Sequence, residues 1–332
     1  MTRRRAGCLP SALMGAQPDW TLLPDGPESQ EAFAFEQGSL LDAMRSRDAG
    51  ESQFEYVGVL GGYRLHNHTV GQALRTLFHW HNETVNVWLH VLGFLACAAL
   101  LAHAASFAAL PARGGATVMA EPLFASIEVA RWPLQFFLGS AMVCLAGSAT
   151  YHLFGTANSR WTSTLATADY AGVTALIVGS FVPLVYYGFD APELSKLGSW
   201  YVGLMLALGL AVLGLSGTAF FHNESLRGLR VGLYVALGFS GALPIGHALA
   251  LRGWEPATRL MVGAAGSTGG IYLFGCVFYL SRFPESFMPG KFDRIGSSHN
   301  VWHALIVTAS LVHYALLLEL WHVTHAARRG AY

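Results

Sequence analysis

Long apolar runs dominate the chain after its first 70 residues and predict membrane-spanning helices. Each run is near the roughly 20 residues that cross a bilayer as a helix. The seven runs occupy residues 85–110, 134–154, 165–187, 200–221, 229–251, 260–280 and 301–322. The alternating strands of a membrane barrel are missing from the pattern, and a continuous apolar run satisfies its backbone hydrogen bonds in lipid only as a helix. The pattern therefore predicts an all-α membrane protein, a bundle of seven transmembrane helices.

Composition and charge agree with this class. The chain is 53% hydrophobic and only 12% charged, with a mean hydropathy of +0.41, whereas soluble domains carry about 25% charged residues. The formal net charge is zero, so we expect no nucleic-acid partner. Both lysines, Lys196 and Lys291, fall between the runs, which excludes a retinal Schiff base in the seventh helix. Three of the four cysteines lie inside apolar runs, so no disulfide framework or metal motif is indicated.

The polarity of successive segments divides the chain into four parts. Residues 1–70 mix proline, glycine, serine and acids, and we expect a mobile tail there. Residues 71–83 are interpreted as an interfacial segment leading into the first helix, residues 84–322 as the transmembrane domain, and residues 323–332 as a short C-terminal tail. Glycine-rich stretches inside the runs, "GLMLALGLAVLGLSG" and "GAAGSTGG", predict close helix packing. Basic residues are divided almost evenly between the two membrane faces, so the positive-inside rule does not orient the bundle.

Polar residues occur where three helices must reach the same membrane face. After an even number of crossings the chain returns to the side of its amino terminus, so the second helix ends there and the third and seventh begin there. The second helix ends with "GSATYHLFG", which contains Ser148 and His152, and the third begins with "ATADYAGV", which contains Asp169. The seventh begins with His299 and His303, which share a helix face. Three imidazoles and one carboxylate are therefore expected at one depth.

This set of side chains predicts a metal site. Ionisable groups within spanning helices usually face the bundle interior and mark functional sites. Three neutral histidines are the ligands of a catalytic Zn2+ site with an open fourth position, so we expect Zn2+ at His152, His299 and His303. Asp169 is expected beside the site, holding the metal's water without binding the metal. The alternative is a set of independently satisfied polar groups at the same depth.

The other histidines near the membrane are interpreted as structural. Four belong to the opposite face by the same count of crossings: His103, His247, His322 and His325. His313 lies in the middle of its run without a partner in the pattern. The stretch "FHWHNETVNVWLH" is on the correct face but mostly precedes the first run, so its polar residues, Glu83 and His90 included, are interpreted as an interfacial helix cap.

Four stretches in this order resemble the signatures of the adiponectin-receptor family, also called the progestin and adipoQ receptor family, which is related to the haemolysin III proteins. They are "GYRLHNHTVGQALRTLFHWHNETVNVWLHVLGF", "SATYHLF", "ADYAGVTALIVGSFVPLVYYGF" and "FPESFMPGKFDRIGSSHNVWHALIV". The resemblance implies a cytoplasmic amino terminus and a zinc ion near the cytoplasmic face. The family's zinc ligands match His152, His299 and His303, and its water-holding aspartate and its serine match Asp169 and Ser148.

The resemblance also implies a function, the hydrolysis of ceramide to sphingosine and a free fatty acid. Asp169 would transfer protons, Ser148 would stabilise developing charge, and a cavity between helices would hold the acyl chain. Membrane lipids such as ceramide or fatty acid, and a signalling protein, are the implied partners. The alternative is a non-enzymatic receptor or Golgi scaffold in which zinc is structural. The motifs "HLF" and "DYAG" are as close to the family's Golgi-tethering branch as to its hormone receptors, so the plasma membrane and the Golgi or ER are all open as locations.

Overall fold

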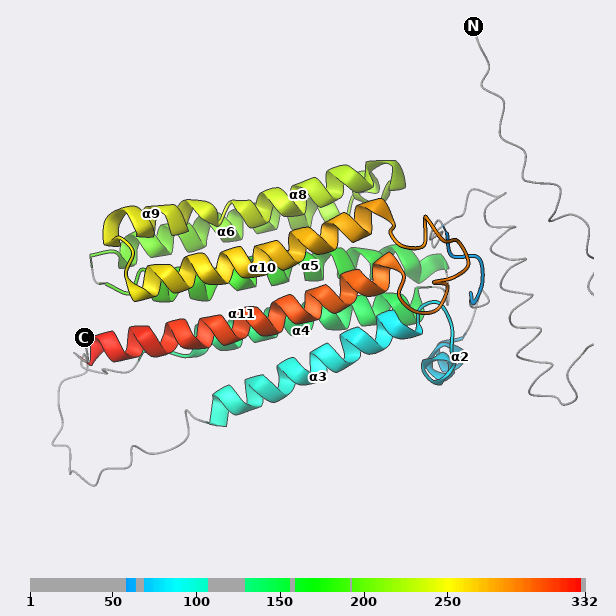
Figure 1. The fold of residues 1–332 in the computed structure, drawn as a ribbon, viewed down its shortest axis with the longest axis horizontal. Coiled ribbons are helices and arrows are strands. Elements are labelled where there is room, and N and C mark those ends of the chain that lie inside the picture. The colour runs from blue at the N-terminus through cyan, green and yellow to red at the C-terminus, as the bar shows by residue number, and fades with distance from the viewer. Residues whose placement is uncertain (1–57, 64–68, 107–128, 156–158, 192, 330–332) are drawn as a thin grey trace, which may run out of the picture.

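Long helices packed side by side form the molecule (Figure 1). The computed structural model describes residues 58–63, 69–106, 129–155, 159–191 and 193–329, and within these ranges every regular element is helical. Seven helical segments are long and apolar enough to cross a membrane: Thr84–Ala104, Trp132–Phe154, Trp161–Gly188, Ser195–Ser216, Glu224–Arg252, Pro256–Ser281 and Ser298–Arg328. The predicted seven-helix bundle is therefore confirmed for the described part of the chain.

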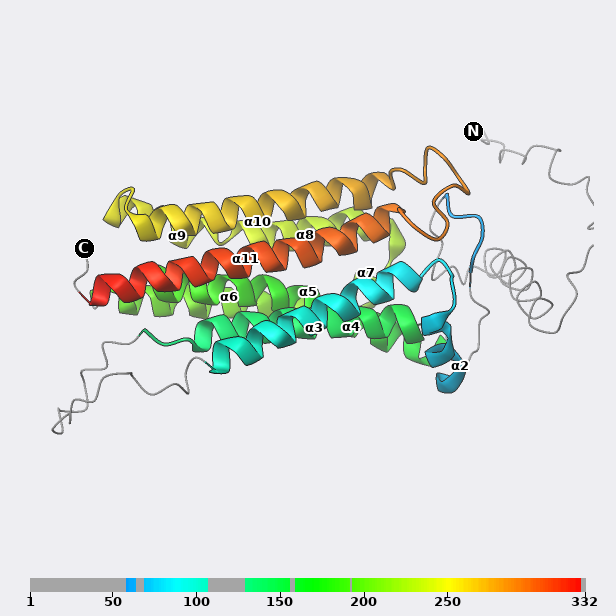
Figure 2. The ribbon, with the colours of Figure 1, turned by 60° about the horizontal axis from the view of Figure 1, so that its bottom comes forward.

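The first four long helices run back and forth along the bundle axis. A short helix α2 (Val70–Arg75) precedes α3 (Thr84–Ser106), the first span. Next come α4 (Trp132–Phe154), α5 (Ser159–Gly188) and α6 (Ser195–Ser216). The end of α4 and the starts of α3, α5 and α11 (Ser298–Arg328) lie at one end of the bundle, as the count of crossings predicts (Figures 1 and 2). The last helix continues past residue 322, the end of its apolar run.

The fifth span is broken in the middle, although its sequence reads as one apolar run. It consists of α8 (Arg227–Phe239) and α9 (Ala242–Arg252), which follow the short α7 (Ala219–His222). Pro244 has no N–H to bond back across the break. Gly241 lies so close to α5 that a Cβ there would be 1.7 Å from the Phe181 ring. The break thus brings the backbone of this span against α5 at one point, before α10 (Pro256–Ser281) returns along the bundle.

Small residues allow α4 and α5 to approach closely. A Cβ on Gly172 would lie 2.7 Å from the Cα of Cys144, and one on Gly179 would lie 2.4 Å from the Cβ of Ser140. Fully buried leucines on the same helices, Leu138, Leu145 and Leu184, complete the contact. This pair of helices is the compact side of the bundle, and it holds the C-terminal turn of α4 at a fixed place beside α5.

Most of the glycines predicted to allow close helix packing have no neighbouring helix against them. In "GAAGSTGG" on α10, a Cβ on any of the glycines, at positions 263, 266, 269 and 270, would meet no atom within 4 Å. In "GLMLALGLAVLGLSG" only Gly209 packs tightly, against Val178, while Gly203, Gly214 and Gly217 face open space. The packing prediction is therefore wrong for most of these positions, because these glycines face the cavity or the outer surface of the bundle rather than a neighbouring backbone.

Residues 58–63, expected to belong to the tail, lie against the loop between α10 and α11. The backbone N–H of Gly290 donates to the carbonyl of Gly58 at 2.9 Å, and that of Leu60 donates to Oδ1 of Asp293 at 2.9 Å. The rest of the expected tail up to residue 57, residues 64–68 and most of the connection after α3 lie outside the described residues. These contacts tie the segment before α2 to the loop that leads into α11.

Candidate metal site

The structure brings together the three histidines that the sequence selects as metal ligands. One ring nitrogen from each of His152, His299 and His303 lies within 4.8 Å of the other two. The Nε2 atoms of His152 and His299 are 3.2 Å apart, and the ring centroids of His299 and His303 are 4.5 Å apart. His152 and His303 are buried, and His299 is half-buried. Convergence of imidazoles from α4 and α11 is thus confirmed.

The start of α11 is fixed immediately before its first histidine. The Ser297 side chain caps the helix by accepting from the N–H of Asn300 at 3.3 Å. The buried Glu285 carboxylate accepts from the N–H of Ser298 at 2.7 Å and also from the hydroxyl of that serine. Since these contacts satisfy N–H groups of the first turn that have no partner within the helix, they set the position from which His299 projects.

A carboxylate that sequence reasoning placed in an interfacial cap lies inside the site. Oε2 of Glu83 is 2.7 Å from Nδ1 of His152, and it also accepts from Nδ2 of Asn86 at 2.8 Å. Glu83 is 1% exposed. Burial alone would raise the pKa of this carboxyl, but the adjoining His152 and His299 rings and the Asn86 amide outweigh burial and hold its pKa below the usual range. The cap interpretation is therefore wrong for Glu83.

Two further residues of α3 contact the ring of His303. Nδ1 of His303 is 3.3 Å from the backbone carbonyl of Asn86, whose side-chain oxygen accepts from Nδ2 of Asn300 at 2.6 Å. The ring of His90 stacks on that of His303, with centroids 3.8 Å apart and an interplanar angle of 8°. Glu83, immediately before α3, therefore touches a ligand from α4, and the first two turns of α3 touch a ligand from α11, without any of them being among the converging ligands.

The donor arrangement suits a metal ion. Carboxylate and carbonyl oxygens only accept, so the Nδ1 atoms that face Glu83 and Asn86 carry the protons in neutral His152 and His303. The Nε2 atoms of both rings then present lone pairs. A metal-bound histidine usually donates its other N–H to a carboxylate or carbonyl in this way, and three imidazoles leave the open position of a catalytic site.

Asp169 and Ser148 are the other two residues that the sequence assigns to the site. Both line the same cavity as the three imidazoles. Ser148, on α4, is buried and hydrogen-bonds the carboxylate of Asp169 in the first half of α5. Asp169 is half-buried because it borders the cavity. Both residues therefore lie on the cavity wall, and their roles in the site stay predictions.

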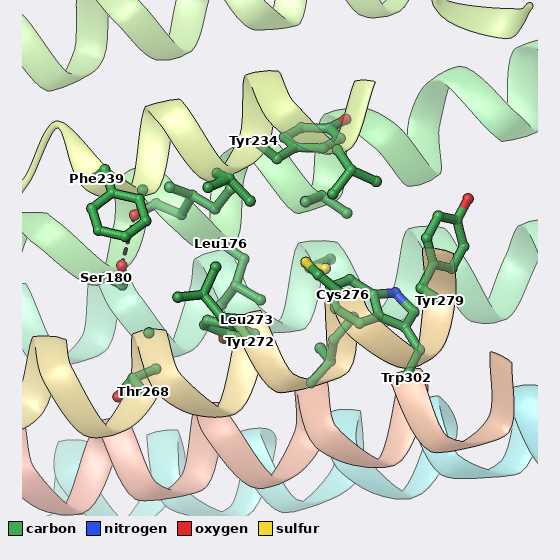
Figure 3. A pocket seen from close by; sticks show the side chains of 18 of the residues that line it. Leu176, Ser180, Tyr234, Phe239, Thr268, Tyr272, Leu273, Cys276, Tyr279 and Trp302 are labelled. Atoms are coloured by element: carbon green, nitrogen blue, oxygen red, sulfur yellow. Dashed lines mark hydrogen bonds between the residues drawn. The ribbon is translucent and has the colours of Figure 1, made fainter. Parts of the chain in front are cut away.

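A cavity of about 790 Å³ leads from the histidines into the middle of the bundle. Its wall comes mainly from α5, α8, α10 and α11, with residues of α4 and α9 as well. Figure 3 shows side chains that turn toward it: Leu176 and Ser180, Tyr234 and Phe239, Tyr272, Leu273, Cys276 and Tyr279, and Trp302. Gly266 and Gly269 of α10 also border it, and their missing side chains leave it wide. Apart from the end that holds the three histidines, the wall is mainly apolar and aromatic, which suits a lipid chain.

Two of the remaining histidines hydrogen-bond within the bundle, and one of them, His313, differs from the prediction. His313 has partners, because its Nδ1 is 3.1 Å from the Thr268 hydroxyl and its Nε2 is 3.0 Å from the Ser180 carbonyl. It also borders the cavity. His247 is paired with the Tyr201 hydroxyl at 2.9 Å on the opposite side of the bundle.

The residues that sequence reasoning missed share a recognisable spacing. Asn86 and His90 follow Glu83 by three and seven positions, so the three side chains share one face of a helix that is otherwise apolar. By the count of crossings this face begins at the same depth as the triad. A polar stripe at this spacing is therefore the signal that could have identified the outer contacts of the site.

The fold and the buried histidines define a multi-pass integral membrane protein with a candidate metal site. Comparison with known proteins agrees, since the haemolysin-III-related family profile matches residues 78–314. Heptahelical transmembrane protein 5 of Arabidopsis thaliana is 31% identical over 77% of this chain and 84% of its own, and heptahelical transmembrane protein ADIPOR1 of Oryza sativa subsp. japonica is 34% identical over 73% and 75%. The adiponectin receptor protein of Drosophila melanogaster is 33% identical over 75% of this chain and 52% of its own. The chain belongs to the haemolysin-III-related family, which includes the adiponectin receptors.

Proposed function

We propose that this protein binds Zn2+ at His152, His299 and His303 and hydrolyses the amide bond of a ceramide-like lipid. The observation that carries the proposal is the convergence of three imidazoles at one end of a cavity whose remaining wall is mainly apolar. A lipid amide has its polar group at one end of long chains, so it matches a cavity with one polar end. The volume of about 790 Å³ is in the range of small-molecule sites.

The chain's own residues supply the proton transfers. When bound, Zn2+ acts as a Lewis acid and activates a water molecule. Asp169 borders the cavity beside His152, so its carboxylate accepts a proton from the attacking water and returns one to the leaving amine nitrogen. The Ser148 hydroxyl donates to that carboxylate and orients it. Once Asp169 has taken up the proton of the water, the same hydroxyl is free to donate to the developing oxyanion. The products are a sphingoid base and a free fatty acid.

The proposal includes an orientation and a place. The amino terminus and the metal site lie on the cytoplasmic side of the plasma membrane or of a Golgi or ER membrane. The support is the family resemblance, in which the site lies at the cytoplasmic end. A signalling protein is the second proposed partner, after the membrane lipid.

A receptor or scaffold is the second candidate function, and the name of the Drosophila relative favours it. In that case the metal would join α4 to α11 without chemistry. The arrangement of Asp169 on the cavity wall favours the enzyme, because a purely structural zinc normally has four protein ligands.

The deciding experiment is ceramide turnover by the purified protein, with Asp169→Ala as the variant and bound zinc measured in both. Turnover by the wild type, lost in a variant that keeps its zinc, supports hydrolysis. Bound zinc without turnover of ceramides of any chain length contradicts hydrolysis and favours the scaffold. A wild type that binds no zinc after metal loading contradicts both.

A further inference from the structure

We propose that the start of α3 is the positioning element of the metal site: Glu83 and Asn86 aim the rings of His152 and His303 without binding the metal. The inference rests on the proposed zinc site and identifies the residues that hydrogen-bond its ligand rings. It follows from contacts between α3 and two other helices, since both residues are buried where α3, α4 and α11 meet.

Glu83 determines which nitrogen of His152 faces the other ligands. Its Oε2 lies 2.7 Å from Nδ1 of His152, on the side away from His299, while Nε2 of His152 lies 3.2 Å from Nε2 of His299. A carboxylate cannot donate, so it keeps the proton of His152 on Nδ1 and the lone pair on Nε2. A negative partner also makes the opposite nitrogen a stronger metal ligand.

Asn86 links this carboxylate to α11. Its side-chain nitrogen donates to Oε2 of Glu83 at 2.8 Å, and its side-chain oxygen accepts from Nδ2 of Asn300 at 2.6 Å. Its backbone carbonyl lies 3.3 Å from Nδ1 of His303 and keeps the proton of that ring on the outer nitrogen. One residue therefore relates the orientation of His152 on α4 to that of His303 on α11.

His90 adds a steric constraint from the next turn of α3. Its ring is parallel to that of His303 at a centroid distance of 3.8 Å and prevents the His303 ring from rotating. Both of its ring nitrogens are buried, and neither has a hydrogen-bond partner among the described residues. The position of His90 therefore comes from packing against His303, whereas Glu83 and Asn86 act through hydrogen bonds.

A purely structural role for Glu83 predicts a different result from a positioning role. A structural carboxylate would stabilise the helix contact, and its loss would lower thermal stability while leaving the metal's affinity and coordination geometry unchanged. A positioning carboxylate affects the metal itself. Outer hydrogen-bond partners of this kind change metal affinity by about 10–100-fold.

The test measures metal affinity and geometry in the purified full-length protein. Zinc affinity is determined by competition with a chromogenic chelator, and the geometry by the visible absorption spectrum after loading with Co2+. The variants are Glu83→Gln, Glu83→Ala and Asn86→Ala. Tyr187→Phe is the control, because it removes a comparably buried hydrogen bond, to the carbonyl of Ala130 at the opposite end of the bundle.

We expect Glu83→Ala to weaken zinc binding by about 10–100-fold and to alter the Co2+ spectrum. Glu83→Gln should lose less, since an amide oxygen still accepts from His152, and Asn86→Ala should lose least because its backbone carbonyl remains. Tyr187→Phe should keep wild-type affinity and spectrum. Wild-type affinity and an unchanged spectrum in folded Glu83 variants would overturn the positioning role alone. A wild type that takes up neither Zn2+ nor Co2+ would overturn the proposed function and this inference with it.

Discussion

The two ends of α11 both carry histidines, but their side chains are arranged differently. At the opposite end from the site, Nε1 of Trp321 donates to the Val129 carbonyl at 3.0 Å, and the N–H of Val129 approaches Nδ1 of His325 at 3.4 Å. The His325 ring stacks on that of Trp321. Nε of Arg328 donates to Asp190 at 2.7 Å. The polar groups at this end are therefore paired with one another or with backbone.

At the site end the imidazoles face each other instead. The closest ring nitrogens of His152 and His299 are 3.2 Å apart, and the groups that orient the cluster, Glu83 and Asn86, contact it from outside. The comparison shows that an abundance of histidine does not define a site. Lone pairs directed at a common point, with acceptors behind the rings, distinguish a candidate metal site from a satisfied helix end.

The largest expected effect is the loss of zinc binding on removal of a histidine at the site end, with a histidine at the other end as the control. His303→Ala should lower zinc affinity by more than about 100-fold, beyond the loss of an outer partner, because a ligand is gone. His325→Ala should leave zinc content unchanged, since its ring lies against Trp321. Elemental analysis of both purified variants checks this. Equal zinc content in His303→Ala and wild type would contradict the assignment of the site.

Asp169→Asn should separate metal binding from chemistry at the site end. The amide is similar in size but cannot accept a proton, so we expect ceramide turnover to fall about 10²–10⁴-fold. Zinc content should stay at the wild-type level, because Asp169 is not among the converging ligands. Loss of zinc in this variant would instead show that Asp169 is itself needed to hold the metal.

A bulky residue on the cavity face of α10 should change substrate preference. A Cβ on Gly269 meets no atom within 4 Å, and the residue borders the cavity. Gly269→Leu should reduce turnover of long-chain ceramides by roughly 10–100-fold, corresponding to an overpacking cost of about 1–3 kcal/mol, while short-chain substrates are spared. Gly263→Leu is the matched control, since Gly263 has equal space but is exposed away from the cavity. Uniform losses for all chain lengths would argue against acyl-chain binding there.

The features that could be predicted from sequence follow from the lengths of the apolar runs and from the order in which the chain crosses the membrane. Seven apolar runs determine the spans, and the count of crossings alone is enough to bring His152 to His299. Glu83 was missed because it lies at the edge of its run, where sequence does not show whether a helix start is buried. The glycines of α10 were misread for another reason: whether a small residue faces a backbone or a void depends on helix separation, as at Gly172 and Gly269.

The smallest effect is expected at the end of α11 away from the site. Arg328 is 36% exposed and its partner Asp190 is 13% exposed, and an ion pair this accessible contributes at most about 1 kcal/mol. Arg328 also lies in the last turn of α11, where a cation favours the helix dipole. Arg328→Ala and Asp190→Asn should therefore lower the midpoint of thermal unfolding only slightly and leave zinc affinity at the wild-type value. Because both changes remove the same pair, the double variant should lose little more than either single variant. A fall in zinc affinity with either change would mean that strain at one end of α11 reaches His299 and His303 at the other, so the two ends would not be independent.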